Sequence, residues 1–376
     1  MKRKFMKGGE AVAEAAIRAG CRFYAGYPIT PQNETPEYFA RRMPDVGGTF
    51  LQGESEIASV NMVLGAAIAG AKAMTSSSSV GISLKSEGIS QAANGCQPIV
   101  IANFMRGGPG GGTIQPAQND YLQATKASGN GGFKMIVFAP CNVQEAADLT
   151  YEAFAVAERD RHPSLVLVDG VIASMMEPVV LPPMRTDEEL KAELDGRRNW
   201  ICHGRRTRGW NAIELDLWYG RSAMVNAEAE ARTGKPVMEH TLENANKLWA
   251  ELYEQWAKND TRVELYRMDD AEYVITGYGT GGRVCKAAVD ALRDEGYKVG
   301  LIRPIIISPF PVNAYKELDP AKIKFVLDSE MAIPGQMFED VQASLCDRIP
   351  SYYYGRSGGH ILEEEEVIEA FKSHLD

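Results

Sequence analysis

Residues 23–31 read Phe-Tyr-Ala-Gly-Tyr-Pro-Ile-Thr-Pro, a short apolar strand that runs directly into a turn containing two prolines. A proline restricts the residue before it to extended conformations, so we expect Tyr27 and Thr30 to be extended. The hydroxyl of Thr30 is then held at the carboxyl end of a strand, where open parallel sheets bind ligands. Alternatively, Thr30 caps a helix that starts near Gln32.

Helices and short apolar strands alternate on both sides of this stretch, from about residue 8 to residue 177. Such alternation predicts a parallel sheet covered by helices on both faces. We expect helices at 11–19 and 57–69, and strands at 23–26, 72–75, 99–104, 135–138 and 165–168. A second α/β pattern begins at residue 273, with strands at 273–276, 298–302 and 325–328 and helices at 283–295 and 364–375. The sequence therefore predicts an α/β protein with two doubly wound units.

Three prolines at positions 178, 182 and 183 end the first pattern. A charged, Trp-containing segment follows, with helical stretches at 187–194 and 242–258, and we interpret it as a linker that clasps another surface. The predicted division is a first domain at 1–185, an insert at 186–262 and a second domain at 263–376.

Composition excludes several classes of function. The chain has 376 residues and a formal net charge of −10, which disfavours nucleic acid as a partner. Its apolar runs fall short of the ~20 residues of a membrane-spanning helix, and no secretory signal is visible, so we expect a cytoplasmic protein. The six cysteines lack the spacing of metal ligands, so no metal or iron–sulfur cluster is expected on this chain alone.

An acidic residue begins the most apolar predicted helix. Glu56 precedes a run of apolar and small residues that predicts a helix buried on every side. A carboxylate at a helix N-terminus is favoured by the helix dipole, but at a buried site it needs a group that donates a hydrogen bond or a proton. The alternative is a solvated Glu that only complements the dipole.

Two further strand ends carry polar groups. The strand at 99–104 leads to Arg106 and then to the glycine-rich stretch 107–112. A guanidinium there can pair with a carboxylate, and the glycines allow a ligand to approach the backbone; alternatively, Arg106 is a surface residue before a flexible loop. The serine run 76–79 also follows a strand, although serine-rich turns are common. Thr, Ser, Arg and Glu are thus expected at one edge of the sheet.

Residues 277–282, Gly-Tyr-Gly-Thr-Gly-Gly, match the GxGxxG pattern of dinucleotide-binding turns. The next strand ends in Arg303 rather than in the carboxylate that an NAD site requires, although an Arg could accept the extra phosphate of NADP. The other interpretation is a tight turn in which glycines let the strand and helix approach each other.

Several of these motifs resemble the alpha subunit of 2-oxoacid:ferredoxin oxidoreductases, with the branched-chain (2-oxoisovalerate) type closest and the 2-oxoglutarate type near it. The resemblance rests on residues 26–34, 50–56, 76–84, 106–109 and 115–118. It implies a doubly wound pyrimidine-binding domain of the thiamine diphosphate type, joined to a transketolase C-terminal-like α/β domain. On the same resemblance the turn at 277–282 binds no nucleotide. Val80 departs from the pattern, because many relatives have Pro there.

The resemblance also implies a reaction. A 2-oxoacid, CoA and oxidised ferredoxin would give acyl-CoA, CO2 and reduced ferredoxin. Glu56 would contact the aminopyrimidine ring of thiamine diphosphate, Thr30 would lie beside the substrate, and Arg106 would hold its carboxylate. Pro28 and Ile29 are further candidates for cofactor contact.

The motif for the diphosphate is missing, because Val168-Asp169-Gly170 lacks the Asn ligands that should follow it. A beta subunit would therefore bind the diphosphate and Mg²⁺, and partner subunits would carry [4Fe-4S] clusters. The expected partners are this beta subunit, a gamma subunit, a ferredoxin-like subunit or domain, and ferredoxin. Two rival hypotheses remain: an NADP-binding oxidoreductase that uses the turn at 277–282, and a non-catalytic assembly subunit.

Overall fold

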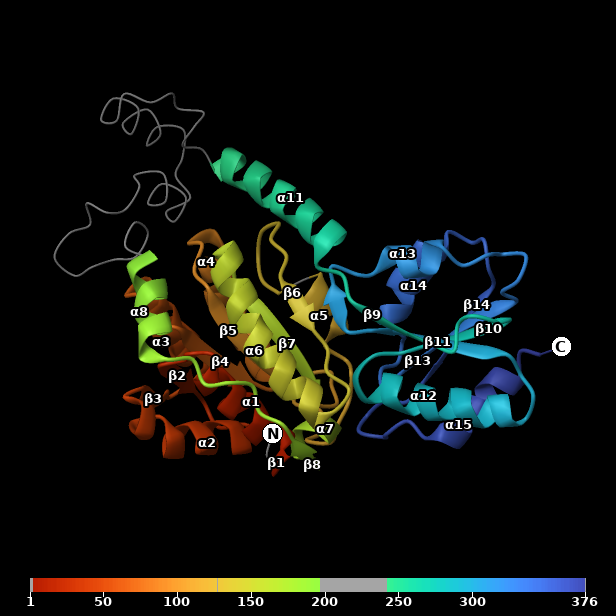
Figure 1. Cartoon of the computed structure of the whole chain (residues 1–376), viewed down its shortest axis with the longest axis horizontal. Coiled ribbons are helices and arrows are strands. Elements are labelled where there is room, and N and C mark those ends of the chain that lie inside the picture. Colours follow the sequence, from red (N-terminus) through yellow and green to blue (C-terminus); the bar gives the residue numbers. More distant parts are fainter. Residues whose placement is uncertain (1–2, 127, 197–241, 376) are drawn as a thin grey trace.

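The computed structural model describes residues 3–126, 128–196 and 242–375, and places them in two α/β units that lie side by side (Figure 1). The predicted linker falls partly outside the described residues, at 197–241. Within the described ranges, every helix is too short or too polar to cross a lipid bilayer.

The first unit is built on a seven-stranded sheet of order β12-β6-β7-β5-β4-β2-β3, in which only β12 is antiparallel to its neighbour. Its strands are β2 (Phe23–Gly26), β3 (Thr49–Gln52), β4 (Ala73–Ser77), β5 (Ile99–Met105), β6 (Ile136–Phe138), β7 (Ser164–Asp169) and β12 (Ile306–Ser308). Its helices are α1 (Gly8–Arg18), α2 (Glu34–Arg42), α3 (Glu56–Ile68), α4 (Val80–Asn94), α5 (Tyr121–Thr125), α6 (Val143–Asp160) and α7 (Gly170–Ser174), with a 3-10 turn at Pro44–Val46. The parallel sheet predicted from the alternating pattern is therefore confirmed.

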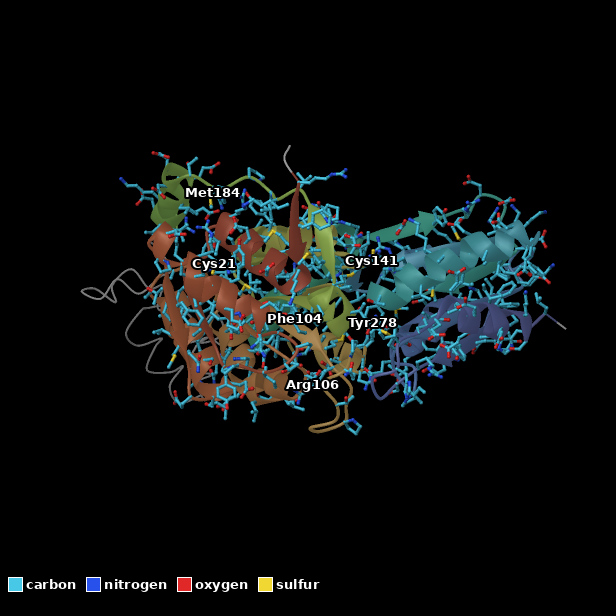
Figure 2. The ribbon with its side chains drawn as sticks, turned by 90° about the horizontal axis from the view of Figure 1, so that it is seen from below. Cys21, Phe104, Arg106, Cys141, Met184 and Tyr278 are labelled. Atoms are coloured by element: carbon cyan, nitrogen blue, oxygen red, sulfur yellow. The ribbon has the colours of Figure 1, made fainter. Side chains whose placement is uncertain are left out.

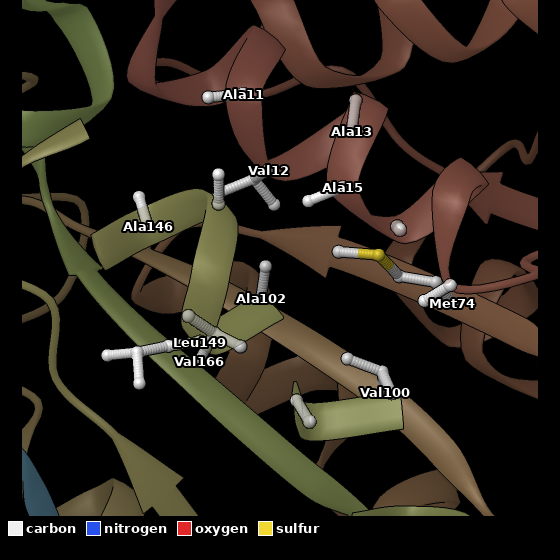
Figure 3. Packing of buried hydrophobic residues seen from close by; sticks show 14 of the residues in the cluster. Ala11, Val12, Ala13, Ala15, Met74, Val100, Ala102, Ala146, Leu149 and Val166 are labelled. Atoms are coloured by element: carbon white, nitrogen blue, oxygen red, sulfur yellow. The ribbon is translucent and has the colours of Figure 1, made fainter. Parts of the chain in front are cut away.

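One face of this sheet is covered by helices and forms an apolar core with them. The small residues of α1 let it pack closely against α6, and both helices cover the sheet (Figure 3). Val12, Ala102 and Val166 are fully buried in this core. Helices α3 and α4 belong to a second apolar cluster, which also includes residues of the second unit.

The second unit has a five-stranded sheet of order β14-β13-β10-β11-β9, parallel except for β9. Its elements are β9 (Val263–Tyr266), β10 (Tyr273–Thr276), α12 (Gly279–Asp294), β11 (Val299–Pro304), α13 (Val312–Lys316), β13 (Phe325–Glu330), α14 (Met337–Leu345), β14 (Ser351–Gly355) and α15 (Glu364–Lys372). Strand β12, which follows β11 in the chain, leaves this unit and pairs with β6 of the first sheet. The two units are therefore joined through a shared sheet.

The remaining described elements pack against the first unit, and two of them, both helices, lie at the two ends of the segment 186–262. A small two-stranded sheet pairs β1 (Lys4–Lys7) with β8 (Met176–Val179). Helix α8 (Asp187–Gly196) is held by an ion pair of 2.6 Å between Lys72 and Glu193. Helix α11 (Leu242–Asn259) inserts Trp256, which donates a hydrogen bond of 2.8 Å to Asp160 and packs on the buried His162.

Candidate active site

The carboxyl ends of four adjacent parallel strands, β5, β4, β2 and β3, form one edge of the first sheet. The predicted site residues follow directly from these strands. The convergence of Thr, Ser, Arg and Glu that the strand ends indicated is thus present in the fold, because neighbouring parallel strands end on the same side.

Arg106 and Thr30 contact each other at this edge. One terminal guanidinium nitrogen of Arg106 donates to the carbonyl of Thr30 at 3.0 Å, and the other donates to the carbonyl of Gly111 at 3.1 Å. Its Nε is buried and has no partner, and no carboxylate of the described residues forms an ion pair with it. Figure 2 shows Arg106 at the rim of the first unit, just past the end of the strand that carries Phe104. Arg106 as a whole is half-buried. A guanidinium with spare donors is suited to a planar anion such as a carboxylate.

The turn that carries Thr30 is held in place by hydrogen bonds of the buried residue Gln32. Gln32 is fully buried, donates to the carbonyl of Tyr27 at 2.8 Å and hydrogen-bonds Ser76. Helix α2 begins at Glu34 with Asn33 as its N-cap, so Thr30 does not cap it. Thr30 and Ile29 are half-buried in this turn, and Pro28 is exposed.

Residues 76–84, one of the stretches on which the resemblance rests, contain the start of a helix, because α4 begins at Val80. We call residues 76–81 the serine turn. Ser79 is the N-cap residue with φ 35° and ψ −89°, so Val80 occupies the first helical position. Proline is favoured at that position, which explains why Val and Pro can replace each other here without moving the helix.

The serine turn leaves polar groups unpaired. The hydroxyls of Ser77 and Ser78 are buried and have no hydrogen-bond partner in the part of the chain that the structure describes. Ser79 is satisfied: its hydroxyl donates to Asp120 at 2.6 Å and accepts from the backbone N–H of Arg106 at 3.0 Å. Burial raises the pKa of Asp120. Unpaired buried hydroxyls are rare in folded proteins and mark positions where another molecule can supply the partner.

Glu56 lies on the other side of the serine turn from Arg106. It is the first residue of α3, is 5% exposed, and follows Ser55, whose side chain caps the helix by accepting from the N–H of Ala58 at 3.1 Å. Among the described residues its carboxylate accepts no hydrogen bond, and its low exposure favours the interpretation of a carboxylate largely shielded from solvent. A methyl group on Gly81 would lie 2.7 Å from Oε1 of Glu56, so the turn and the carboxylate are in contact.

The sequence also missed a basic residue here: Lys85 of α4 is fully buried and donates to the backbone carbonyl of Glu56 at 3.1 Å. Its neighbours in sequence, Leu84 and Ser86, gave no signal of this position, which depends on the packing of α4 against α3.

The expectation that α3 is buried on every face is wrong for this chain alone. Ile57 is 51% exposed, and Leu84 on the neighbouring α4 is 50% exposed. Leu51 on β3 and Tyr27 after β2 are also exposed apolar residues. The exposed face of α3 carries one polar residue, Asn61, beside Ile57. Exposed apolar residues gathered in this way mark a surface for a partner, and the described part of this chain does not cover them.

A pocket of about 610 Å³ opens between the two units, next to the glycine-rich stretch that follows Arg106. Its lining contains polar residues such as Ser79 and Asp120 and apolar residues such as Ile333 and Pro334, as small-molecule sites do. Arg106, Thr30 and Glu56 are not among its lining residues.

The glycine turn, residues 277–282, does not present a phosphate site. The buried carboxylate of Asp169 accepts from the backbone N–H of Thr280 at 2.8 Å and from its hydroxyl at 2.7 Å. Gln118 donates to the carbonyl of Tyr278 at 2.8 Å. Arg303, the proposed reader of an NADP phosphate, is 3% exposed and bonded to Glu145 and Glu264. The start of α12 is thus filled by the first unit, which rules against the dinucleotide interpretation.

The residues at the strand edge fit the pyrimidine end of thiamine diphosphate: a buried carboxylate without a hydrogen bond, and two unpaired hydroxyls in the adjoining turn. They do not fit its diphosphate or a metal ion. Asp169 of the Val-Asp-Gly run is engaged with Thr280, and the described residues contain no cluster of three or more metal-ligating side chains.

Comparison with known proteins gives the class of protein first. Residues 14–245 match the family model described as pyruvate flavodoxin/ferredoxin oxidoreductase, thiamine diphosphate-binding, and residues 271–367 match pyruvate:ferredoxin oxidoreductase core domain II. The two units therefore define a thiamine diphosphate-type oxidoreductase subunit. This chain belongs to the 2-oxoacid:ferredoxin oxidoreductase family, as an alpha-type subunit.

The relatives are similar over their full length. The ketoisovalerate oxidoreductase subunit VorB of Methanothermobacter thermautotrophicus is 40% identical over 99% of this chain and 98% of its own. The 2-oxoglutarate synthase subunit KorA of Archaeoglobus fulgidus is 34% identical over 100% of both chains.

The solved structure of 2-oxoglutarate:ferredoxin oxidoreductase from Magnetococcus marinus has a TM-score of 0.79 at 25% identity, covering 100% of this chain and 66% of that one. Transketolase from Campylobacter jejuni, at 13% identity and a TM-score of 0.54, covers 99% of this chain and 47% of that one, and shares the fold.

Proposed function

We propose that this chain is the alpha subunit of a thiamine diphosphate-dependent 2-oxoacid:ferredoxin oxidoreductase that converts a 2-oxoacid, CoA and oxidised ferredoxin into acyl-CoA, CO2 and reduced ferredoxin. The observation that carries the proposal is Arg106. Among the described residues its guanidinium is bonded to backbone carbonyls, those of Thr30 and Gly111, and its Nε is buried and unpaired. Such a group recognises the carboxylate that every 2-oxoacid shares.

The cofactor would be held at its pyrimidine end by this chain, by Glu56 with Pro28 and Ile29. When bound, thiamine diphosphate supplies an electron sink for the decarboxylation. Glu56 would hold a proton between its carboxylate and the ring nitrogen that faces it, and its burial keeps water from competing for that proton. Arg106 would orient the substrate through its carboxylate, and the hydroxyl of Thr30 would lie next to the reacting carbon.

Partner subunits would complete the site. The exposed apolar surface of Leu51, Ile57, Leu84 and Tyr27 lies around Glu56, where a beta subunit carrying the diphosphate and Mg²⁺ would cover it. A gamma subunit and a ferredoxin-like subunit or domain with [4Fe-4S] clusters would pass electrons to ferredoxin. CoA would enter as the co-substrate.

The substrate would be a branched-chain 2-oxoacid. This proposal is supported by the 40% identity with a ketoisovalerate oxidoreductase subunit and by the apolar residues in the lining of the pocket, which include Val80, Ile333 and Pro334. The alternatives are 2-oxoglutarate, supported by the 34% identity with a 2-oxoglutarate synthase subunit, and an aryl 2-oxoacid.

The test uses the complex assembled with its partner subunits. Replacing Glu56 by Gln should lower ferredoxin-linked turnover by roughly 10² to 10⁴, the range typical of acid–base catalysis. Glu54→Gln, an exposed neighbour two residues away, is the control. Unchanged turnover in Glu56→Gln would instead identify a non-catalytic assembly subunit. Comparing kcat/KM across branched-chain, dicarboxylic, aryl and short 2-oxoacids decides the substrate.

A further inference from the structure

Lys85 is a buried cation whose hydrogen bonds are incomplete. Its side chain is fully buried, and the bond of 3.1 Å to the backbone carbonyl of Glu56 is the one it makes among the described residues. A protonated lysine has three donors, so two are unused. An incompletely bonded buried ammonium is destabilising, and it persists in a protein where it has a function or a partner.

The charged surroundings of Lys85 are simple. Helix α3, which packs against α4, carries Glu56 as its one charged residue, and strand β4 carries none. On α4 itself the other charged residue is Glu87, which is exposed. Glu56 is therefore the charge that Lys85 responds to.

Burial and Glu56 act on Lys85 in opposite directions. Burial lowers the pKa of Lys85 to about 7, and the negative charge of Glu56 partly opposes this shift by favouring the protonated form. If the carboxylate of Glu56 is neutralised, that opposition disappears and Lys85 holds its proton less tightly. The protonation states of the two residues are therefore linked.

We propose that Lys85 is a positioning residue that anchors the first turn of α3 and stores the proton that Glu56 requires when the pyrimidine ring binds. The inference rests on the proposed function. The balance is simple: the Nζ–H bond of protonated Lys85 breaks, leaving a neutral amine, and one proton reaches the carboxylate of Glu56, where it is shared with the ring. No proton is then taken from solvent for this step.

Proton counting tests the proposal without measuring turnover. Binding of thiamine diphosphate with Mg²⁺ to the assembled complex is followed by calorimetry at a pH of about 6, in two buffers with different ionisation enthalpies. Relative to the wild-type complex, Lys85→Met should take up about one more proton from solvent on binding, because the stored proton is gone. Lys85→Arg should show the same increase, because arginine does not release its proton; this variant also covers the case in which Lys85→Met fails to assemble.

The chain offers a matched control. Lys72 is also buried and its pKa is also lowered by burial, but it follows the C-terminal end of α3, opposite to Glu56, and is paired with Glu193 at 2.6 Å. Lys72→Met should leave the proton count of binding unchanged.

Equal proton uptake by the wild type, Lys85→Met and Lys85→Arg would overturn the role of Lys85 while leaving the proposed function intact. Failure of the wild-type complex to bind thiamine diphosphate would instead overturn the proposed function.

Discussion

The serine turn and the glycine turn occupy equivalent places, each between the end of a parallel strand and the start of a helix. In the glycine turn, Asp169 and Gln118 of the first unit satisfy the start of α12. In the serine turn, Ser77 and Ser78 remain unpaired beside a buried Glu56. The glycine turn, which has the better-known sequence pattern, thus serves to connect the two units. The serine turn, whose pattern is weaker, has the unpaired hydrogen-bonding groups of a binding site.

Of the changes that test this comparison of the two turns, filling the space in the serine turn should have the largest effect. In Gly81→Ala the new methyl group would lie 2.0 Å from the hydroxyl of Ser77 and 2.7 Å from Oε1 of Glu56. Both side chains must move, and a displacement of about 1 Å at a reacting group can lower the rate ~10²-fold. Turnover of the assembled complex should therefore fall by roughly that factor. Gly65→Ala on α3 is the control, because a methyl group there meets no described atom of this chain within 4 Å. It measures the effect of adding a methyl group to the surface that a partner would cover. Full activity in Gly81→Ala would show that the turn is not part of the site.

A smaller effect, on stability rather than turnover, is expected from Asp169→Ala. The variant leaves the N–H and hydroxyl of Thr280 buried without acceptors, at a cost of about 2 kcal/mol. The thermal unfolding midpoint of the complex should fall, while turnover per folded complex stays near the wild-type value. Asp169→Asn retains one acceptor oxygen and should lose less stability. A selective loss of turnover with normal stability would mean that the glycine turn takes part in catalysis.

Gly279→Ala should have a milder effect. Gly279 has φ +53°, and an added methyl group would lie 2.8 Å from both Asp169 and Gln118. Left-handed backbone at a residue other than glycine costs on the order of 1 kcal/mol, and here the new group also crowds the joint. The expected result is a modest fall in the unfolding midpoint. No change would indicate that the two units separate easily at this contact.

No effect at all is expected from NADPH. Because Asp169 occupies the helix N-terminus and Arg303 is paired with Glu145 and Glu264, titration should give no saturable change in NADPH fluorescence. Saturable binding that Arg303→Ala abolishes would reverse the assignment of the two turns.

The sequence predicted strands β2, β4, β5, β6 and β7 of the first sheet, because strands such as β2 and β5 are short apolar runs bounded by turn residues. It did not predict β3, which is largely exposed, or β12, which reaches this sheet from the second unit. It also predicted Thr30, Glu56 and Arg106 at one edge, since parallel strands end together. It did not predict where α4 begins, because the serine run resembles a loop and Val80 gives no start signal.

The partners of buried groups were also beyond the sequence. Lys85 reads as an ordinary helix lysine until α3 is packed against α4, and Asp169 reads as part of an incomplete metal motif until α12 is placed on it. Such contacts join residues far apart in the chain, so local patterns carry no information about them.

Strand β12 gives the chain a particular vulnerability. In the sequence it follows β9, β10 and β11 of the second sheet, yet it pairs with β6 and forms the edge of the first sheet. A fragment that stops near residue 262 would leave the backbone groups of β6 open to pairing with strands of other molecules. During synthesis, some forty residues beyond position 262 must be made before β12 can pair with the exposed edge of β6. We therefore expect the two halves to self-associate when they are expressed separately.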